Sequence, residues 1–311
     1  MARDSKNPRL KTKRGNTQKT IPGSKNIRSR RQVKNSLLLG VLMFVSGFIK
    51  ILLKLILRFF IGWAFRGLVV IIIILSGTVF YYKVNLPALS DMLDARAKGS
   101  VLLLDKHKDI FAWRGEQFGA IAEADNISVH LKNAILAVED KRFYRHFGVS
   151  PRGIAGAIRI NLSEGRGALS GHGGSTITQQ TAKLLCLGKP YKAKDWKSES
   201  QYEANCRQSS LWRKIKEALF AIALELEFTK DEIMTLYLNR AFLGAGSRGF
   251  QAASQRYFNK SASNLNPAEA AMLAGLLVAP SRYAPTNNLS KSQNRASIIL
   301  DLMEQQGLLS S

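Results

Sequence analysis

Two neighbouring acidic residues, Glu139 and Asp140, stand at the end of a helical pattern and could carry acid–base chemistry. Apolar residues recur before them at helical spacing, at Leu131, Ala134, Ile135 and Val138. This pattern predicts an amphipathic helix that begins near Asn126 or Ser128. Glu139 follows at the edge of the apolar stripe, where partial desolvation would raise the pKa of its carboxyl group toward the range of a general base. The alternative is a solvated carboxylate paired with one of the basic residues that follow it.

A second carboxylate, Glu217, lies within a helical pattern from Ser210 to Phe228. Apolar residues occupy nearly all sides of the later part of this helix, so we expect it to be buried. A buried carboxylate needs a partner, and Arg213 and Lys214 stand four and three residues earlier. The pattern alone leaves open whether Glu217 serves only in a buried ion pair or takes part in chemistry.

A glycine-rich loop from Glu164 to Gly174 lies between these two acids and leads into Ser175-Thr176-Ile177-Thr178-Gln179-Gln180. Thr176 and Gln179 have the spacing of a capping box at the start of a helix. The free backbone N–H groups at such a helix start bind anions such as pyrophosphate. Lys183 adds a positive charge one turn further along.

The two cysteines, Cys186 and Cys206, bracket the polar stretch from Leu187 to Ser209, which is typical of a surface loop. In a cytosolic protein they would be incidental thiols. Outside the membrane, a disulfide that closes the loop is the favoured interpretation. No certain metal site is expected, because the four histidines show no ligand spacing with the cysteines.

The net charge of +24 is concentrated at the N-terminus, where residues 1–66 contain 16 of the 46 Lys and Arg residues and a single acid, Asp4. Residues 1–35 are basic and nearly free of large apolar groups, which predicts a disordered tail. A basic tail can bind nucleic acid or mark the cytoplasmic side of a membrane segment.

The next stretch favours the membrane. Residues 36–82 are predicted to be membrane-associated, with a transmembrane helix at about 61–82, which reaches the roughly 20 residues that a span requires. Before it, basic residues recur every fourth position and predict a helix in the inner interface rather than a second crossing: Lys50, Lys54 and Arg58. The basic tail places the N-terminus in the cytoplasm and everything after Lys83 outside. No convincing cleavage site follows, so we expect a retained, single-pass membrane anchor.

The remaining chain divides into a connector, residues 83–125, and a helical region, residues 126–311. The connector contains two short strand-like runs around the polar turn at 105–109, which predict a β-hairpin. The predicted helix from Ser150 to Leu162 has an apolar side that can face either a core or lipid. The fold class is therefore mainly α, with a compact helical domain behind an N-terminal transmembrane anchor.

The chain resembles the peptidoglycan glycosyltransferase family, glycosyltransferase family 51, in four motifs that follow one another in order. This family is the polymerase module of penicillin-binding proteins and of monofunctional transglycosylases. The first motif, E-D-x-x-F-x-x-H-x-G, is met by Glu139, Asp140, Phe143, His146 and Gly148. The second, G-G-S-T-I-T-Q-Q, is complete at residues 173–180 and is followed by Lys183. The third motif, R-K-x-x-E, is met by Arg213, Lys214 and Glu217. The fourth, K-x-x-I-x-x-x-Y-x-N, is met by Lys230, Ile233, Tyr237 and Asn239.

The resemblance implies a lysozyme-like helical fold that polymerises lipid II, with inversion at the donor sugar and release of undecaprenyl pyrophosphate. It implies that Glu139 is the catalytic base. Three cations would neutralise the departing pyrophosphate: Lys183, Arg213 and Lys214. Glu217 would orient them or hold a divalent ion, Mg or Mn, although no cofactor is required. Other substrate contacts are expected at Lys141, Phe143, His146, Ser175, Thr176, Gln179, Gln180 and Asn239.

The chain departs from the family pattern in two places. Ser247-Arg248-Gly249-Phe250 stands where a Tyr-Gly pair is usual, and the stretch Leu187 to Ser209 resembles an insertion, in which Arg207 is a candidate for contact with substrate phosphate. The sequence contains no Ser-x-x-Lys and no Lys-Thr-Gly, the signature of a transpeptidase. We therefore expect either a monofunctional polymerase or the polymerase half of a longer protein.

Two other functions are compatible with parts of the sequence. A lysozyme-like hydrolase or lytic transglycosylase also places two carboxylates beside a sugar, but it has no pyrophosphate to neutralise with the cations of the second and third motifs. A catalytically silent membrane scaffold would have no use for Glu139 and Glu217. The expected partners are lipid II, the growing glycan strand, membrane lipids, and a transpeptidase or other cell-wall synthesis protein. Nucleic acid is not expected.

Overall fold

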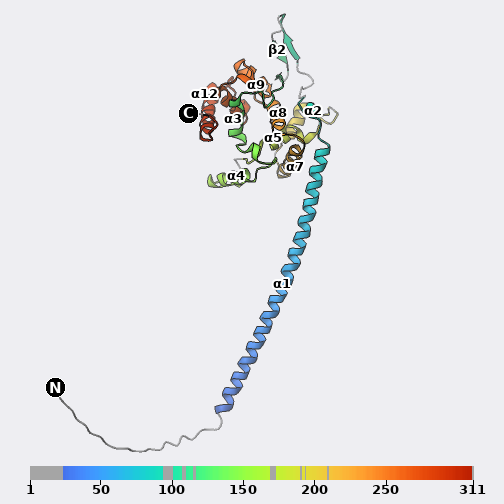
Figure 1. Ribbon diagram of the computed structural model, residues 1–311, viewed down its shortest axis with the longest axis vertical. Helices are drawn as coiled ribbons and strands as arrows, with labels where there is room; N and C mark the ends of the chain where they lie inside the picture. The colour runs from blue at the N-terminus through green and yellow to red at the C-terminus, as the bar shows by residue number, and fades with distance from the viewer. Residues whose placement is uncertain are drawn as a thin grey trace, which may run out of the picture. The chain divides into compact units, whose positions relative to one another are not determined.

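A computed structural model describes residues 24–93, 101–106, 110–114, 117–168, 173–189, 191–192, 194–208 and 210–309. The chain divides into two compact units, Met1–Ile71 and Ile72–Ser311. The described residues are mainly helical (Figure 1), which confirms the predicted fold class. Residues 1–23 of the predicted disordered tail lie outside the described residues.

Helix α1, Ser24–Val84, is one unbroken helix of 61 residues. The predicted disordered tail extended to residue 35, whereas this helix begins at Ser24. The predicted interfacial helix and transmembrane span both lie within this one helix. No proline occurs between Ser24 and Val84, so no residue type in this stretch forces the backbone out of helical geometry. At 1.5 Å per residue the helix is about 90 Å long, roughly three times the hydrocarbon thickness of a bilayer.

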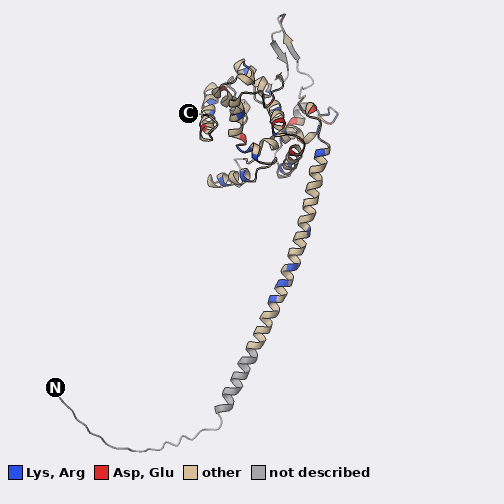
Figure 2. Cartoon of the chain, viewed as in Figure 1, with Lys and Arg blue, Asp and Glu red and all other residues tan. Residues whose placement is uncertain are grey.

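The part of α1 from Leu39 to Val84 is long and apolar enough to cross a membrane, as judged from its length and composition. Its large apolar side chains are mostly exposed, whereas Val79 and Tyr82 near its end are partly buried. Figure 2 shows a tan helix with a few isolated blue positions and no red, because no acid occurs between Asp4 and Asp91. This composition agrees with the predicted N-terminal anchor.

After α1, the chain forms the short helix α2, Leu89–Leu93, and a small antiparallel pair of strands, β1, Val101–Leu104, and β2, Ile110–Arg114. These strands coincide with the two runs that predicted a hairpin. Residues 107–109 of the predicted turn lie outside the described residues. A second pair is parallel and joins β3, Gln117–Phe118, to β4, Ser247–Arg248.

The rest of the second unit consists of helices. Their bounds are α3, Val129–Glu139; α4, Pro151–Ser163; α5, Ile177–Leu184; α6, Glu199–Arg207; α7, Leu211–Glu227; α8, Lys230–Arg240; α9, Phe250–Phe258; α10, Pro267–Leu276; α11, Pro280–Tyr283; and α12, Leu289–Gln305. Short 3₁₀ turns occupy Phe143–Arg145, Cys186–Gly188 and Ala262–Asn264. Figure 1 shows α5 and α8 in the middle of this helical body and α12 at its edge.

Capping residues begin several of these helices as the sequence predicts. Ser128 is the N-cap of α3, and its hydroxyl donates to the carbonyl of Leu265 instead of capping the helix. Reciprocal capping boxes begin α5, α8 and α10. In each box, the side chain of the N-cap residue and the side chain of the third helical residue bond each other's backbone N–H. The pairs are Thr176 with Gln179, Thr229 with Glu232, and Asn266 with Glu269. Each box satisfies two helix-end N–H groups.

Two local features differ from the sequence-based expectation. The stretch from Leu187 to Ser209, predicted to be a surface loop, contains helix α6, whose first residue follows the N-cap Ser198. Pro280, a residue type that often ends a helix, occupies the first position of α11. Proline is well tolerated there because its missing N–H would have no helical partner.

The core lies where α3, α5, α7, α8, α10 and α12 pack together. Its fully buried side chains include Leu131, Ile135, Phe143, Ile177, Leu224 and Tyr237. Each large apolar side chain buried in this way contributes roughly 1.5–3 kcal/mol relative to exposure. Helices α3 and α5 carry the first two motifs, so this packing fixes the motifs relative to each other.

Candidate active site

A cleft of about 1010 Å³ lies in the second unit. Glu139 at the end of α3, Gln180 and Lys183 on α5, Glu217 on α7 and Tyr237 on α8 line it together. The cleft therefore brings residues from all four sequence motifs to one place. Both carboxylates that the sequence singled out face the same space.

Glu139 is positioned by Gln180. Its Oε2 accepts a 2.7 Å hydrogen bond from Gln180 Nε2, and the Gln180 Oε1 accepts a 3.4 Å bond from the Tyr237 hydroxyl. Burial raises the pKa of Glu139 above its ordinary value, and the nearby Asp140 raises it further, whereas Gln180 and Arg295 oppose the rise. This agrees with the predicted desolvation of Glu139 and gives a carboxylate that is a stronger base than a solvated one.

The carboxylate of Asp140 bonds two other segments of the chain and holds them together. Its Oδ2 lies 2.7 Å from His146 Nε2 and accepts a 3.2 Å bond from the backbone N–H of Ile177. Ile177 is the first residue of α5, where a negative charge also interacts favourably with the helix dipole. Asp140 therefore ties the end of α3 to the start of α5 and brings Gln180 within reach of Glu139.

The first and second motifs also meet through Gly148 and Thr176. The Thr176 hydroxyl donates a 2.6 Å bond to the carbonyl of Gly148 and accepts from the N–H of Gln179. Gly148 has a φ of +72°, and a Cβ atom there would lie 2.9 Å from the backbone of Ala221. Only glycine fits this conformation and this close approach without strain.

Glu217 is almost fully buried, with 2% of its surface exposed, and it is paired with cations. Its Oε1 lies 3.3 Å from Arg213 Nε, and its Oε2 lies 2.9 Å from Lys214 Nζ. Lys214 also donates a 3.1 Å bond to the hydroxyl of Ser175, which follows the glycine-rich loop. The predicted pairing of Glu217 with Arg213 and Lys214 is therefore present, and it is connected to the second motif.

Lys183 lines the cleft one turn after Gln180. Burial lowers the pKa of its ammonium group, and the neighbouring cations Lys214, Arg213 and Arg207 lower it further, whereas Glu217 opposes this fall. A cluster of cations held close together in a partly buried cleft favours the binding of an anion, which relieves their mutual repulsion.

Several residues predicted to contact substrate occupy other positions. Among the described residues, those that line the cleft do not include Lys141, Phe143, His146, Thr176, Arg213 and Asn239. Lys141 is exposed, and Phe143 is buried with the Lys230 ammonium 4.5 Å from its ring centroid. The Asn239 side chain bonds both backbone groups of Ala122 and the carbonyl of Thr235, so it holds the connector.

Other residues line the cleft without having been singled out as site residues. They include Arg240, whose guanidinium donates to the carbonyl of Met92, and Tyr202, Glu203 and Arg248. Arg207, the candidate for contact with substrate phosphate, also lines the cleft. Tyr237 could have been found from its place in the fourth motif. Arg240 and Glu203 had no local signal, because their positions follow from the docking of segments far apart in sequence.

The described residues of the cleft do not form a metal site from protein groups alone. Among the described residues, no group of three or more His, Cys, Asp and Glu side chains lies close enough together to hold a metal ion. The carboxylate of Glu217 is already paired with two cations, so it does not offer the uncompensated charge that a divalent ion requires.

Comparisons with known proteins show the family to which this chain belongs. Residues 107–304 match the family model described as Transglycosylase. The chain is 37% identical over 225 residues to penicillin-binding protein 1A of Neisseria flavescens and 33% identical over 249 residues to that of Streptococcus pneumoniae, and these matches cover 72% and 80% of this chain. The same matches cover only 26% and 32% of the relatives' own lengths. A crystal structure of penicillin-binding protein 1A from Haemophilus influenzae matches 68% of this chain and 20% of its own, at 21% identity and a TM-score of 0.34. From the family match over residues 107–304, we conclude that the chain belongs to the transglycosylase family.

Proposed function

We propose that this protein polymerises lipid II into peptidoglycan glycan strands by inverting glycosyl transfer. The observation that carries the proposal is the shared cleft, in which the desolvated carboxylate of Glu139 and the cation cluster around Glu217 face the same space. A base and an anion-binding cluster are the two groups that this reaction needs. The transglycosylase family match and the four ordered motifs support the same conclusion.

Glu139 acts as the general base. It removes the proton from the 4-hydroxyl of the acceptor N-acetylglucosamine, whose oxygen then attacks the anomeric carbon of the donor N-acetylmuramic acid. The raised pKa of Glu139 improves its match to a hydroxyl that becomes acidic only as the new bond forms. Gln180 keeps the carboxylate in one orientation through its 2.7 Å bond.

The cations stabilise the leaving group. As the bond to the donor breaks, negative charge accumulates on the lipid pyrophosphate, which leaves from the face opposite the attacking oxygen. Lys183 and Lys214 line the cleft where this charge would develop, and Arg213 supports them through Glu217. No protein acid is required, because pyrophosphate leaves as an anion. Electrostatic stabilisation of this kind is commonly the largest catalytic contribution.

No step in this mechanism depends on a divalent ion. A Mg or Mn ion at Glu217 would need further oxygen ligands from the substrate phosphates, because the protein supplies one carboxylate that is already paired.

The proposed substrate and the membrane anchor belong together, because lipid II is itself held in the membrane. Helix α4 supports this arrangement, since it exposes apolar residues that a soluble enzyme would bury: Ile154, Ile160 and Leu162. The basic N-terminal residues support a cytoplasmic N-terminus, with the residues after Lys83 outside the inner membrane. A transpeptidase that cross-links the strands is the expected protein partner.

The test is polymerisation of labelled lipid II by the detergent-solubilised full chain, with products separated by glycan length. Wild type should make long strands, and Glu139→Gln should make none while remaining folded. The matched control is Glu227→Gln, which also replaces the last residue of a helix but lies outside the cleft-lining set in a partly exposed pair with Lys83.

Two results would redirect the proposal. Shortening of preformed glycan by wild type would identify a hydrolase or lytic enzyme. Lipid II left untouched by folded wild type would favour a scaffold without catalysis.

A further inference from the structure

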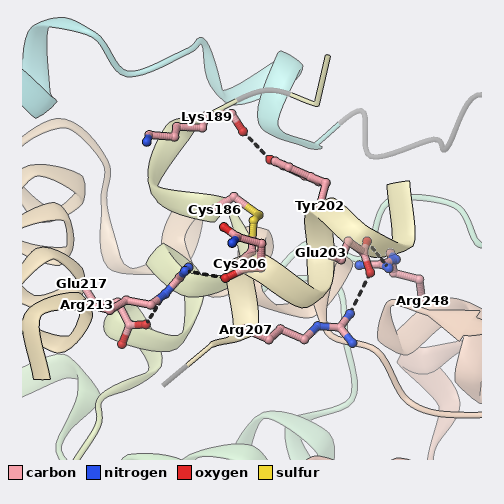
Figure 3. The surroundings of a disulfide bond; sticks show 10 residues. Cys186, Lys189, Tyr202, Glu203, Cys206, Arg207, Arg213, Glu217 and Arg248 are labelled. Atoms are coloured by element: carbon pink, nitrogen blue, oxygen red, sulfur yellow. Dashed lines mark hydrogen bonds and ion pairs between the residues drawn. A yellow bond between two sulfur atoms is a disulfide. The ribbon is translucent and has the colours of Figure 1, made fainter. Parts of the chain in front are cut away.

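A disulfide joins the second motif's helix to the wall of the cleft. Cys186 directly follows α5 and the residue Leu185, and Cys206 lies in the last turn of α6. Their sulfur atoms are 2.06 Å apart in a bond that closes a 20-residue separation (Figure 3). Both cysteines line the cleft, together with Tyr202, Glu203 and Arg207 from α6. The segment Cys186–Arg207, here named the disulfide segment, therefore forms part of the cleft itself.

The disulfide segment also reaches the third motif. The backbone carbonyl of Asn205, next to Cys206, accepts a 2.9 Å hydrogen bond from Arg213 Nη1. The Nε of the same guanidinium donates a 3.3 Å bond to Glu217. Figure 3 shows Arg213 between the end of α6 and Glu217. The position of Cys206 thus sets the carbonyl that orients this arginine.

A second contact docks α6 onto the floor of the cleft. Glu203 pairs with Arg248 at 2.5 Å and with Arg207 at 2.8 Å. Arg248 is 93% buried and belongs to one of the two departures from the family pattern that the sequence indicated. The apparent insertion and the altered cleft floor are separate departures along the sequence. In the structure, the ion pair between Glu203 and Arg248 joins them.

The backbone at the start of the disulfide segment is held in an unfavourable conformation. Cys186 and Leu187 have φ values of +52° and +57°, although neither is glycine. This left-handed geometry costs about 1–2 kcal/mol per residue and persists only where the surroundings enforce it. A covalent bond from Cys186 to α6 is one such constraint.

We propose that the Cys186–Cys206 disulfide is a positioning element of this active site: it holds α6 as a fixed wall, so that the Asn205 carbonyl orients the Arg213 guanidinium beside Glu217. The inference rests on the proposed function, because Arg213 is expected to support, through Glu217, the cations that bind the pyrophosphate. Without the disulfide, α6 is free to separate from α5, and Arg213 loses one of the two groups that orient it. An oxidising compartment outside the membrane would keep the bond formed.

A double-mutant cycle tests whether the disulfide acts through Arg213. Four full-length proteins in detergent are compared: wild type, Cys186→Ser/Cys206→Ser, Arg213→Lys, and the combination of all three substitutions. Two quantities are measured for each, kcat/KM for lipid II polymerisation and the dissociation constant for inorganic pyrophosphate. Thermal unfolding shows that each variant is folded.

Loss of the disulfide should lower kcat/KM by about tenfold and weaken pyrophosphate binding, as expected for one charge-assisted hydrogen bond. In the Arg213→Lys background, the same cysteine substitutions should change either quantity by less than about twofold, since the guanidinium that Asn205 orients is gone. Treatment of wild type with dithiothreitol should reproduce the effect and should leave the Cys186→Ser/Cys206→Ser protein unchanged. Glu203→Gln should shift both quantities in the same direction, whereas Glu164→Gln, outside the cleft-lining residues, should not.

An equal loss in both backgrounds would overturn the inference, because the disulfide would then act on the fold in general. No loss in the wild-type background would also overturn it. If oxidised wild type made no glycan strands, the proposed function would fail, and the pyrophosphate titrations alone would decide the inference by the presence or absence of the same coupling.

Discussion

The side-chain amide of Gln180 donates a 2.7 Å hydrogen bond to the carboxylate of Glu139, and this contact joins residues 41 positions apart in the sequence. It links the end of α3 to the middle of α5, and so the first motif to the second. The bond stabilises the charged form of Glu139, whereas burial favours the neutral form. The balance between them sets the pH at which Glu139 becomes a base.

The first prediction concerns this balance. Replacing Gln180 with leucine removes the hydrogen bond but keeps the volume, so the pKa of Glu139 should rise further. Because a base must be deprotonated to act, the acid limb of kcat/KM should move to higher pH, by about 0.7 unit for a bond worth about 1 kcal/mol. The measurement is the pH profile of lipid II polymerisation, with the exposed Gln293→Leu as control. An acid limb at its wild-type position would show that Gln180 does not tune the base.

A second prediction follows from the cost of burying Glu139. Its folded-state pKa is raised above the ordinary 4.5, so the folded protein holds this proton more tightly than the unfolded chain does. The stability that this group contributes is present below pH 4.5 and is lost as the pH rises through the raised pKa. Glu139→Gln should therefore unfold at a higher temperature than wild type at pH 7, and this difference should shrink at pH 4. Thermal unfolding at both pH values tests the sign, and Glu227→Gln should show no such pH-dependent gain.

A third prediction concerns the ion pair between Glu225 and Lys230. The Glu225 carboxylate, 4% exposed, accepts bonds of 2.7 Å from Lys230 and 2.6 Å from Thr178, which connects α7, α8 and α5. Glu225→Ala would leave the Lys230 ammonium without this partner, and we expect the free energy of unfolding to fall by about 3–5 kcal/mol. Urea unfolding measures it. Asp125→Ala, which removes an exposed carboxylate 4.0 Å from Lys132, should change it by about 0.5 kcal/mol or less.

Features that depend on neighbours in sequence could be predicted from the sequence. The capping boxes at Thr176, Thr229 and Asn266 are examples, because a cap and its partner are three residues apart. The pairing of Glu217 with Arg213 is another, since both lie on one helical face. The four motifs likewise each supplied part of the cleft lining, including Glu139 and its partner Gln180.

Features that depend on distant contacts could not be predicted. Asn239 matched a motif, but its role is decided by Ala122, 117 positions away. Helix α6 is polar throughout, so no apolar stripe distinguished it from a loop, and its place follows from the contacts of Glu203 and Cys206. The length of α1 was also not predicted. Its basic residues indicated a separate interfacial segment, but the helix continues through them without a break.

The last prediction separates two lysines that both line the cleft, Lys183 and Lys189. Lys183 is half-buried among other cations, whereas Lys189 is exposed, so a charge at Lys183 acts through a less screened environment. Lys183→Met should lower kcat/KM by about 10²–10³-fold, as for the loss of one group that stabilises transition-state charge, and Lys189→Met by less than about tenfold. Because the lowered pKa of Lys183 brings its deprotonation to lower pH, the alkaline limb of the wild-type profile should move to higher pH in Lys183→Arg, whose guanidinium stays charged. Equal losses for the two Met variants, or an alkaline limb that does not move in Lys183→Arg, would assign the pyrophosphate charge to other cations of the cleft.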